Sequence, residues 1–381
     1  MKIAIAPNAF KGSLTAAEAA ACIERGLRKS LRGLSIVKIP MADGGDGTLP
    51  AIVAATGGQL VSCRVSDPLG RKIRSQFGLA GDERTAVIEM ALASGLALLK
   101  PHERNPMLTT SRGTGELIRA ALDRGVQEIV IGIGGSATND GGMGMARALG
   151  VKFLDAHGRE LQDCGGALVR LAQIDMSGLD TRLKHTSISV ACDVKNPLCG
   201  PRGAARVYGP QKGATPAMVK QLDAGLKRLA AVLQKDLGVK VANIAGAGAA
   251  GGLGAGLVAI LRARIRPGVD VVTRIIGLER KFEGCDLVIT GEGRLDGQTI
   301  FGKAPAGVAC VAQKLGIPVI AICGSLGPDA SNVRRAGIAA FFSALEESIA
   351  EAELPIRGPG MLERCAEQVG CLLALNYKLR K

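Results

Sequence analysis

The chain has 381 residues, of which 53 are glycine, and its formal net charge is +14. At ~150 residues per domain, this length predicts two to three domains or one large two-lobed unit. Hydrophobic residues make up 47% of the chain and charged residues 22%, which excludes intrinsic disorder, and the glycines follow no three-residue period, which excludes collagen.

The positive charge is compatible with an anionic substrate or with nucleic acid. Two Tyr, seven Phe and no Trp offer few stacking surfaces, so we do not expect nucleic-acid binding. The ten Cys contain no C-x-x-C pair, which argues against a zinc site and predicts thiols in a reducing cytoplasm. The opening apolar run Lys2–Ala6 is too short for a signal peptide, and the glycine-rich run Gly246–Leu261 is too short for a membrane span.

The first elements alternate between strand and helix. We predict a strand at Lys2–Ala6, a helix at Thr15–Leu31 and a strand at Ser35–Pro40. Thr15 and Glu18 have the spacing of a capping box, in which each residue satisfies a backbone N–H of the other at the helix start. This alternation predicts a parallel sheet.

The pattern changes in the middle of the chain. Strands Gln59–Ser66 and Lys72–Leu79 flank Asp67–Gly70, a turn sequence with Pro at its second position, and Thr85–Met90 follows as a third strand. Antiparallel neighbours within an alternating chain indicate an insertion or a second domain. Further predicted elements are helices Ser111–Arg124, Asp140–Leu149 and Thr215–Leu237, and strands Glu128–Ile133 and Thr186–Cys192.

The alternation returns at the end of the chain. The predicted elements there are Asp286–Thr290, Lys303–Leu315, Ile317–Cys323, Ile338–Phe342 and Gly360–Lys378. We therefore predict an α/β fold, in which a Rossmann-like, doubly wound parallel sheet domain (residues 1–64 and 285–381) is interrupted by a second α/β domain with a mixed sheet (residues 65–284).

Five loops combine glycine with charged or hydroxyl residues, and most of them follow a predicted strand. They are residues 6–13, 42–48, 132–142, 192–213 and 290–303. The carboxyl ends of parallel strands face the ligand crevice, so these loops predict the functional site. Loop 132–142 has the composition of a phosphate cradle. Asp43 and Asp46 suit Mg²⁺, although Asp46 suits a helix cap equally well.

Two generic nucleotide motifs are weak in this sequence. Gly246–Gly251 matches G-x-G-x-x-G, which alone supports a nicotinamide-dependent hydroxyacid dehydrogenase as an alternative, but the preceding Val239–Ala245 is a poor strand. Gly297–Ala304 resembles a P-loop, but Ala304 stands where the magnesium-binding Ser or Thr is required, so we reject that reading.

Taken together and in order, the loops resemble the glycerate kinase family of the bacterial type I. The matching stretches are Phe10–Leu14, Ala42–Thr48, Gly134–Gly142, Asp193–Leu198, Gly209–Ala214, Gly246–Gly254, Thr290–Arg294, Gln298–Thr299 and Gly302–Lys303. The chain departs from the family pattern at Asn8 and Ala9, where the family usually has Asp and Ser. This departure leaves a catalytically silent glycerate-binding regulator open as a further alternative.

The resemblance implies a cytoplasmic transferase that uses ATP and Mg²⁺ to phosphorylate D-glycerate at the 2-hydroxyl, giving 2-phosphoglycerate. It implies an active site in the cleft between the two domains, with small molecules as the only substrates and no nucleic-acid or membrane partner. It leaves a homodimer open.

Phosphoryl transfer needs a base, metal carboxylates and cations, and the loops offer candidates for each. Asp296 or Asp193 is the candidate base or a metal ligand, and Lys303 and Lys11 are further catalytic candidates. The metal candidates are Asp43, Asp46 and Glu292. The substrate- and phosphate-binding candidates are Ser13, Gly134, Gly135, Ser136, Asn139, Gly248, Gly251, Arg294 and Thr299.

Overall fold

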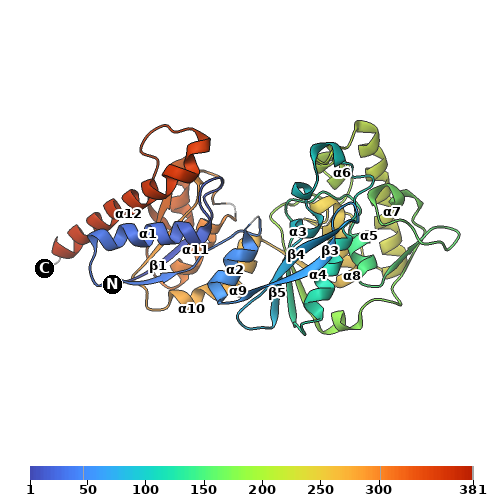
Figure 1. Ribbon diagram of the computed structural model, residues 1–381, viewed down its shortest axis with the longest axis horizontal. Coiled ribbons are helices and arrows are strands. Elements are labelled where there is room, and N and C mark those ends of the chain that lie inside the picture. Colours follow the sequence, from blue (N-terminus) through green and yellow to red (C-terminus); the bar gives the residue numbers. More distant parts are fainter. Residues whose placement is uncertain (46, 301, 380–381) are drawn as a thin grey trace. The chain divides into compact units, whose positions relative to one another are not determined.

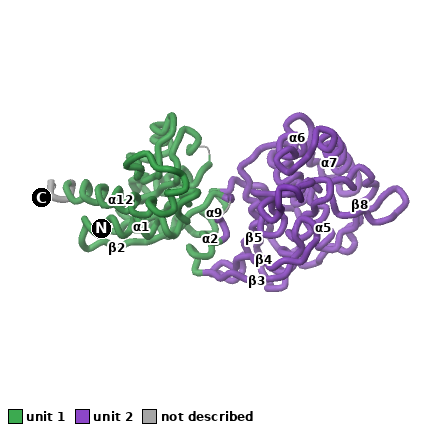
Figure 2. The backbone as a smooth tube through the Cα atoms, turned by 45° about the horizontal axis from the view of Figure 1, so that its top comes forward, with its two compact units in different colours: residues 1–43, 50–57, 269–381 green, residues 44–49, 58–268 purple. Residues whose placement is uncertain are grey.

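The computed structural model describes residues 1–45, 47–300 and 302–379. The chain forms two compact units (Figures 1 and 2). Unit 1 comprises residues 1–43, 50–57 and 269–381, and unit 2 comprises residues 44–49 and 58–268. The inserted domain was predicted at residues 65–284. Unit 2 starts earlier than residue 65, so that it includes the whole strand β3 (Gln59–Ser66), and it ends earlier than residue 284.

Unit 1 is built on a five-stranded sheet whose neighbouring strands are all parallel. In spatial order the strands are β15 (Ile338–Ser343), β13 (Val319–Cys323), β11 (Leu287–Gly291), β1 (Lys2–Pro7) and β2 (Ser35–Lys38). The first strand of the chain thus pairs directly with a strand from its last third. This doubly wound order confirms the predicted Rossmann-like class.

Helices α1 (Ala16–Ser30) and α12 (Leu354–Leu379) pack against each other beside this sheet. Ile3 and Ile5 point into the apolar cluster that these helices share, because side chains two apart in a strand lie on the same face. The predicted capping box is confirmed: the Thr15 side chain accepts from the Glu18 N–H, and the Glu18 carboxylate accepts from the Thr15 N–H. The remaining helices are α11 (Ala304–Lys314), α10 (Leu278–Phe282), α9 (Gly268–Ile276) and α2 (Thr48–Thr56).

Unit 2 contains the mixed sheet that the sequence predicts. Its spatial order is β10 (Arg264–Arg266), β9 (Ser187–Ala191), β6 (Glu128–Gly132), β5 (Thr85–Glu89), β4 (Lys72–Leu79) and β3. The pairs from β10 to β5 are parallel, whereas β4 pairs antiparallel with both β5 and β3. The Gly70 N–H donates to the Asp67 carbonyl, which closes the predicted turn between β3 and β4.

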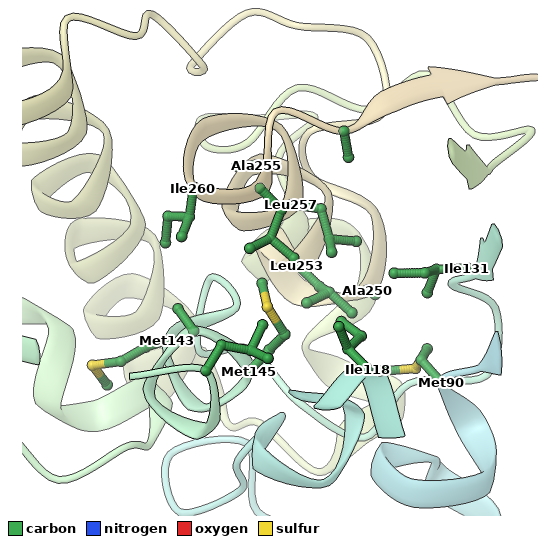
Figure 3. Packing of buried hydrophobic residues seen from close by; sticks show 14 of the residues in the cluster. Met90, Ile118, Ile131, Met143, Met145, Ala250, Leu253, Ala255, Leu257 and Ile260 are labelled. Atoms are coloured by element: carbon green, nitrogen blue, oxygen red, sulfur yellow. The ribbon is translucent and has the colours of Figure 1, made fainter. Parts of the chain in front are cut away.

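An aliphatic and methionine-rich core fills unit 2, with few aromatic side chains (Figure 3). Ile131 of β6 and Ile118 of α4 (Arg112–Leu122) are fully buried in it, as is Met145 of α5 (Met143–Ala148). Helix α8 (Leu253–Leu261) lies in the same cluster, and α7 (Pro216–Leu237) contributes its buried leucines. The shorter elements are α3 (Ala91–Ser94), α6 (Ala204–Tyr208), β7 (Lys152–Leu154) and β8 (Gln173–Asp175).

Several predicted boundaries were wrong, and each error has a local cause. The helix predicted from Asp140 begins at Met143, because Gly141 and Gly142 both adopt positive φ and delay the first helical turn. The helix predicted from Gly360 begins at Leu354 and continues through Pro359, where its packing on α1 outweighs a poor local propensity. Two-residue strands β12 (Arg294–Leu295) and β14 (Ser325–Leu326) carry no periodic signal and were missed.

Across the described residues, no helix combines the length and the hydropathy that a membrane span requires.

Candidate functional site

The strand-end loops of unit 1 bring distant parts of the sequence together. Asn8 follows β1 and Glu292 follows β11, and these two strands are neighbours in the sheet. The Asn8 backbone N–H donates to the Gly291 carbonyl at 2.8 Å, which joins the two loops at their start. The Asn8 side-chain amide also donates to the Asp43 carboxylate at 3.2 Å, so the loop that follows β2 reaches the same place.

A cluster of acids around one lysine occupies the loop after β11. Glu292 is nearly buried, and its carboxylate accepts a hydrogen bond of 2.7 Å from the fully buried Thr299 hydroxyl. The Lys303 ammonium lies 3.8 Å from the Glu292 carboxylate and 3.7 Å from that of Asp296. The structure therefore assembles four predicted site residues, three of them charged, into one group.

Burial raises the pKa of Glu292, and the carboxylates of Asp43 and Asp296 raise it further. The Thr299 hydrogen bond and the Lys303 charge oppose these effects. The influence of Asp43 on Glu292 means that two of the predicted metal ligands share one electrostatic environment. Such a pair suits Mg²⁺, which keeps much of its own water and takes few protein oxygens. The third predicted ligand, Asp46, lies outside the described residues.

Within residues 1–45, 47–300 and 302–379, no three His, Cys, Asp or Glu side chains converge closely enough to form a metal cluster by themselves. The Asn8 side-chain amide lies beside the Asp43 carboxylate. An aspartate at position 8 would supply a further oxygen ligand for a metal ion there. A cation at this site would therefore depend on water or on a bound anion for most of its coordination.

Unit 1 also contains a mainly apolar pocket of about 200 Å³. Lys11 and Ser13 line it, and Lys11 is exposed. The Ser13 hydroxyl donates to the Leu354 carbonyl at 2.9 Å, which ties the loop after β1 to the start of α12. Arg294 is largely exposed, and its guanidinium lies 3.9 Å from the Asp296 carboxylate.

Unit 2 contains a more polar pocket of about 260 Å³ at the carboxyl ends of β6 and β9. Gly134, Gly135 and Ser136 from the predicted phosphate cradle line it, together with Asp193 from the loop after β9. The Asp193 carboxylate accepts from the Gly268 N–H at 2.9 Å, which orients it at the wall. The structure thus groups four of the predicted binding and catalytic residues around one space.

Lys212 also lines this pocket, and it was missed in the sequence. Its side chain is almost fully buried, with its ammonium 2.7 Å from the Ser136 hydroxyl and 2.7 Å from the Thr138 carbonyl. Burial lowers the pKa of Lys212 to about 7, and the charge of Asp140 partly counters that effect. Lys212 falls within the predicted functional loop 192–213 and the family-matching stretch Gly209–Ala214, but neither signal reveals that the lysine is buried.

Asp140 and Asn139 lie in the protein interior next to this pocket. Asp140 is fully buried and accepts hydrogen bonds from the Ser111 N–H and hydroxyl and from the N–H groups of Gly142 and Gly144. The Asn139 side chain is also fully buried, and neither its oxygen nor its nitrogen has a hydrogen-bond partner among the described residues. Buried polar groups of this kind are normally satisfied by water or by another polar group.

Gly248 and Gly251 belong to the segment beside the pocket, and both allow close backbone packing. A Cβ at Gly251 would overlap the Thr138 carbonyl and lie 2.6 Å from the Asn139 Cα. A Cβ at Gly248 would overlap the Pro197 carbonyl. The intervening Ala249 and Ala250 line the pocket, so Gly251 brings the segment against the phosphate-cradle loop and Gly248 brings it against the loop after β9.

The protein has an α/β fold in which glycine-rich loops, carboxylates and lysines lie at the ends of strands. This arrangement is typical of enzymes that transfer phosphoryl groups. The chain belongs to the glycerate kinase family, whose model matches residues 3–374, which confirms the resemblance seen in the sequence. It is therefore an enzyme of the kinase class. Neither the dehydrogenase nor the silent regulator is supported by the comparisons.

Individual relatives give the same result. A glycerate 2-kinase of Escherichia coli (strain K12) is 50% identical over 379 residues, which cover 99% of each chain. A glycerate kinase of Bacillus subtilis (strain 168) is 49% identical over 375 residues and 98% of each chain. A crystal structure from Salmonella typhimurium LT2 with the designation glycerate kinase 2 matches with a TM-score of 0.91 and 47% identity over 100% of both chains.

Proposed function

We propose that this enzyme transfers the γ-phosphoryl group of ATP to the 2-hydroxyl of D-glycerate. The observation that carries the proposal is the full-length similarity to relatives named glycerate kinase and glycerate 2-kinase. The acidic cluster around Lys303 supports it, because phosphoryl transfer depends on positioned charges.

We assign the nucleotide phosphates and Mg²⁺ to the loops of unit 1. Asp43 and Glu292 would hold the ion, which neutralises phosphate charge when it is bound. Thr299 keeps the Glu292 carboxylate oriented through its 2.7 Å hydrogen bond. Lys303, Arg294 and Lys11 would contact the phosphates.

We assign the general base to Asp193 in unit 2. Its carboxylate lines a pocket of about 260 Å³ and is held by the Gly268 N–H. Asp296 is less suitable, because its carboxylate lies 3.7 Å from the Lys303 ammonium, which competes for it. In the reaction the glycerate hydroxyl oxygen forms a bond to the γ-phosphorus, the bond to the ADP oxygen breaks, and Asp193 takes the hydroxyl proton.

A coupled assay for ADP with D-glycerate and ATP-Mg²⁺ tests the activity, and NMR of the product distinguishes 2-phosphoglycerate from 3-phosphoglycerate. Asp193→Asn should lower kcat by about 100-fold or more if this residue is the base. Asp123→Asn, at an exposed carboxylate of unit 2, is the matched control. Absence of ADP formation by the wild-type enzyme would overturn the proposal, and normal turnover by Asp193→Asn would transfer the role of base to Asp296.

The cellular setting is part of the same proposal. All ten cysteines are free thiols, which supports a reducing cytoplasm. Light scattering of the purified enzyme tests whether it is a homodimer.

A further inference from the structure

The buried lysine of unit 2 has no counter-ion within ion-pair distance in the described part of the chain. Lys212 is 2% exposed, and its ammonium donates to two neutral oxygens, the Ser136 hydroxyl and the Thr138 carbonyl. An ammonium has three N–H donors, so one donor remains. A buried charge is costly unless it is paired, and this one lines an open pocket.

Ser136 provides a second donor at the same place. Its hydroxyl oxygen accepts the hydrogen bond from Lys212, which leaves the hydroxyl proton to donate elsewhere. Ser136 lies in the pocket wall after the glycine pair Gly134 and Gly135. A cation and a hydroxyl donor held side by side are suited to the two oxygens of a carboxylate.

The size and charge of the pocket restrict the class of ligand. A volume of about 260 Å³ accommodates a small acid but falls below the ~300–1,000 Å³ that is usual for pockets of drug-sized ligands. Among the described residues that line it, Lys212 supplies the one positive charge and Asp193 the one negative charge. This balance suits a monoanion with a hydroxyl group near Asp193, whereas a polyphosphate would need more cations.

We propose, on the basis of the function proposed above, that Lys212 and Ser136 bind the carboxylate of D-glycerate in this pocket and direct its hydroxyl towards Asp193. Lys212 is then the residue that selects a 2-hydroxy acid over an uncharged polyol. Ser136 acts with it, and Thr138 fixes the position of the ammonium through its carbonyl.

The charge state of Lys212 provides an independent readout. The ionisable groups around it are Asp140, whose charge acts on Lys212, and Cys192, Asp193 and Tyr208, which line the same pocket. Burial raises the pKa of the Cys192 thiol to about 11 and raises that of Tyr208, so both stay neutral near pH 8. Binding of a carboxylate favours protonated Lys212, so the protein should take up a proton at Lys212 when D-glycerate binds at that pH.

Calorimetry of the full-length protein with D-glycerate, without nucleotide and in two buffers of different ionisation enthalpy at pH 8, tests the proposal. Lys212→Met should weaken D-glycerate binding on the order of 10- to 100-fold and abolish the proton uptake. Ser136→Ala should weaken binding less and retain the uptake. Lys220→Met, at an exposed position on α7, is the matched control and should behave as wild type.

Steady-state kinetics separate this proposal from the function on which it rests. The variant Lys212→Met should raise the KM for D-glycerate and leave the KM for ATP within about 3-fold. Unchanged D-glycerate binding by Lys212→Met, or no binding by the wild-type protein, would overturn the proposal. So would a selective loss of ATP or inorganic phosphate affinity, which would make this a phosphate site. Lys212-dependent binding without ADP formation would support the pocket and refute the kinase function.

Discussion

Replacing Gly251 with alanine tests whether backbone contact between two loops holds the pocket of unit 2 together. Gly251 has a φ of +67°, and a Cβ there would overlap the Thr138 carbonyl and lie 2.6 Å from the Asn139 Cα. The left-handed conformation costs a non-glycine residue about 1 kcal/mol, and forced overlap in a packed region adds about 1 to 3 kcal/mol. We expect Gly251→Ala to lower the free energy of unfolding by about 2 to 4 kcal/mol.

Gly238→Ala is the matched control for this variant. Gly238 also lies in unit 2, with a φ of +72°, but a Cβ there would meet nothing within 4 Å. The control should therefore lose only the conformational part, about 1 kcal/mol. Urea unfolding of both variants measures the difference. If Gly251→Ala is no less stable than Gly238→Ala, the two loops are not in obligatory contact and the argument fails.

Three further predictions concern single side chains. Lys303→Ala should lower kcat at saturating ATP by about 100-fold, because the acidic loop loses its cation. The control Lys314→Ala, at an exposed position, should leave kcat unchanged. Thr299→Val should lower the urea midpoint, with a loss of about 1 to 3 kcal/mol, because Glu292 loses a buried donor; an unchanged midpoint would contradict this. Without ligand, Lys212→Met should stabilise the protein by on the order of 2 kcal/mol at pH 7, measured by urea unfolding. The folded-state pKa of Lys212, about 7, lies below its ordinary value of 10.5, so the stability of the wild-type protein rises as the pH rises between these two values. The stability advantage of Lys212→Met should therefore shrink as the pH rises, and an advantage that stays constant with pH would refute this.

The fold could be predicted because its signals are local and repeated. The buried strand β11 carries a continuous apolar run, and the Thr15–Glu18 capping box marks the start of α1. The turn sequence that begins at Asp67 predicts the antiparallel pair β3 and β4. Each signal depends on a few consecutive residues, so no knowledge of tertiary contacts was needed.

The division of the chain between the units could not be predicted in the same way. The chain enters unit 2 for residues 44–49, returns to unit 1 for residues 50–57 and then enters unit 2 again. The helix α2 (Thr48–Thr56) runs across this change, so no loop or composition shift marks it. Domain limits of this kind depend on contacts made far away in the sequence.

The candidate site was predicted where it follows from topology and missed where it depends on burial. Because parallel strands end at one edge, the loops after β6 and β9 had to meet, and Ser136 and Asp193 do line one pocket. Lys212 comes from the turn Pro210–Lys212, near the far end of the loop region 192–213. A lysine in a glycine-flanked turn is usually solvated, and only tertiary packing removes this one from water.

Three departures from ordinary protein chemistry gather at or beside that pocket. Lys212 is a buried cation without an ion pair to any described residue, and Asn139 is a buried amide whose polar atoms have no partner there. Ala250, in the pocket wall, adopts a left-handed conformation with a φ of +52°. Each departure costs free energy that the surrounding core must offset, and such costs concentrate at functional sites. Their concentration beside Ser136 and Asp193 is therefore an argument for a ligand site that does not depend on sequence similarity.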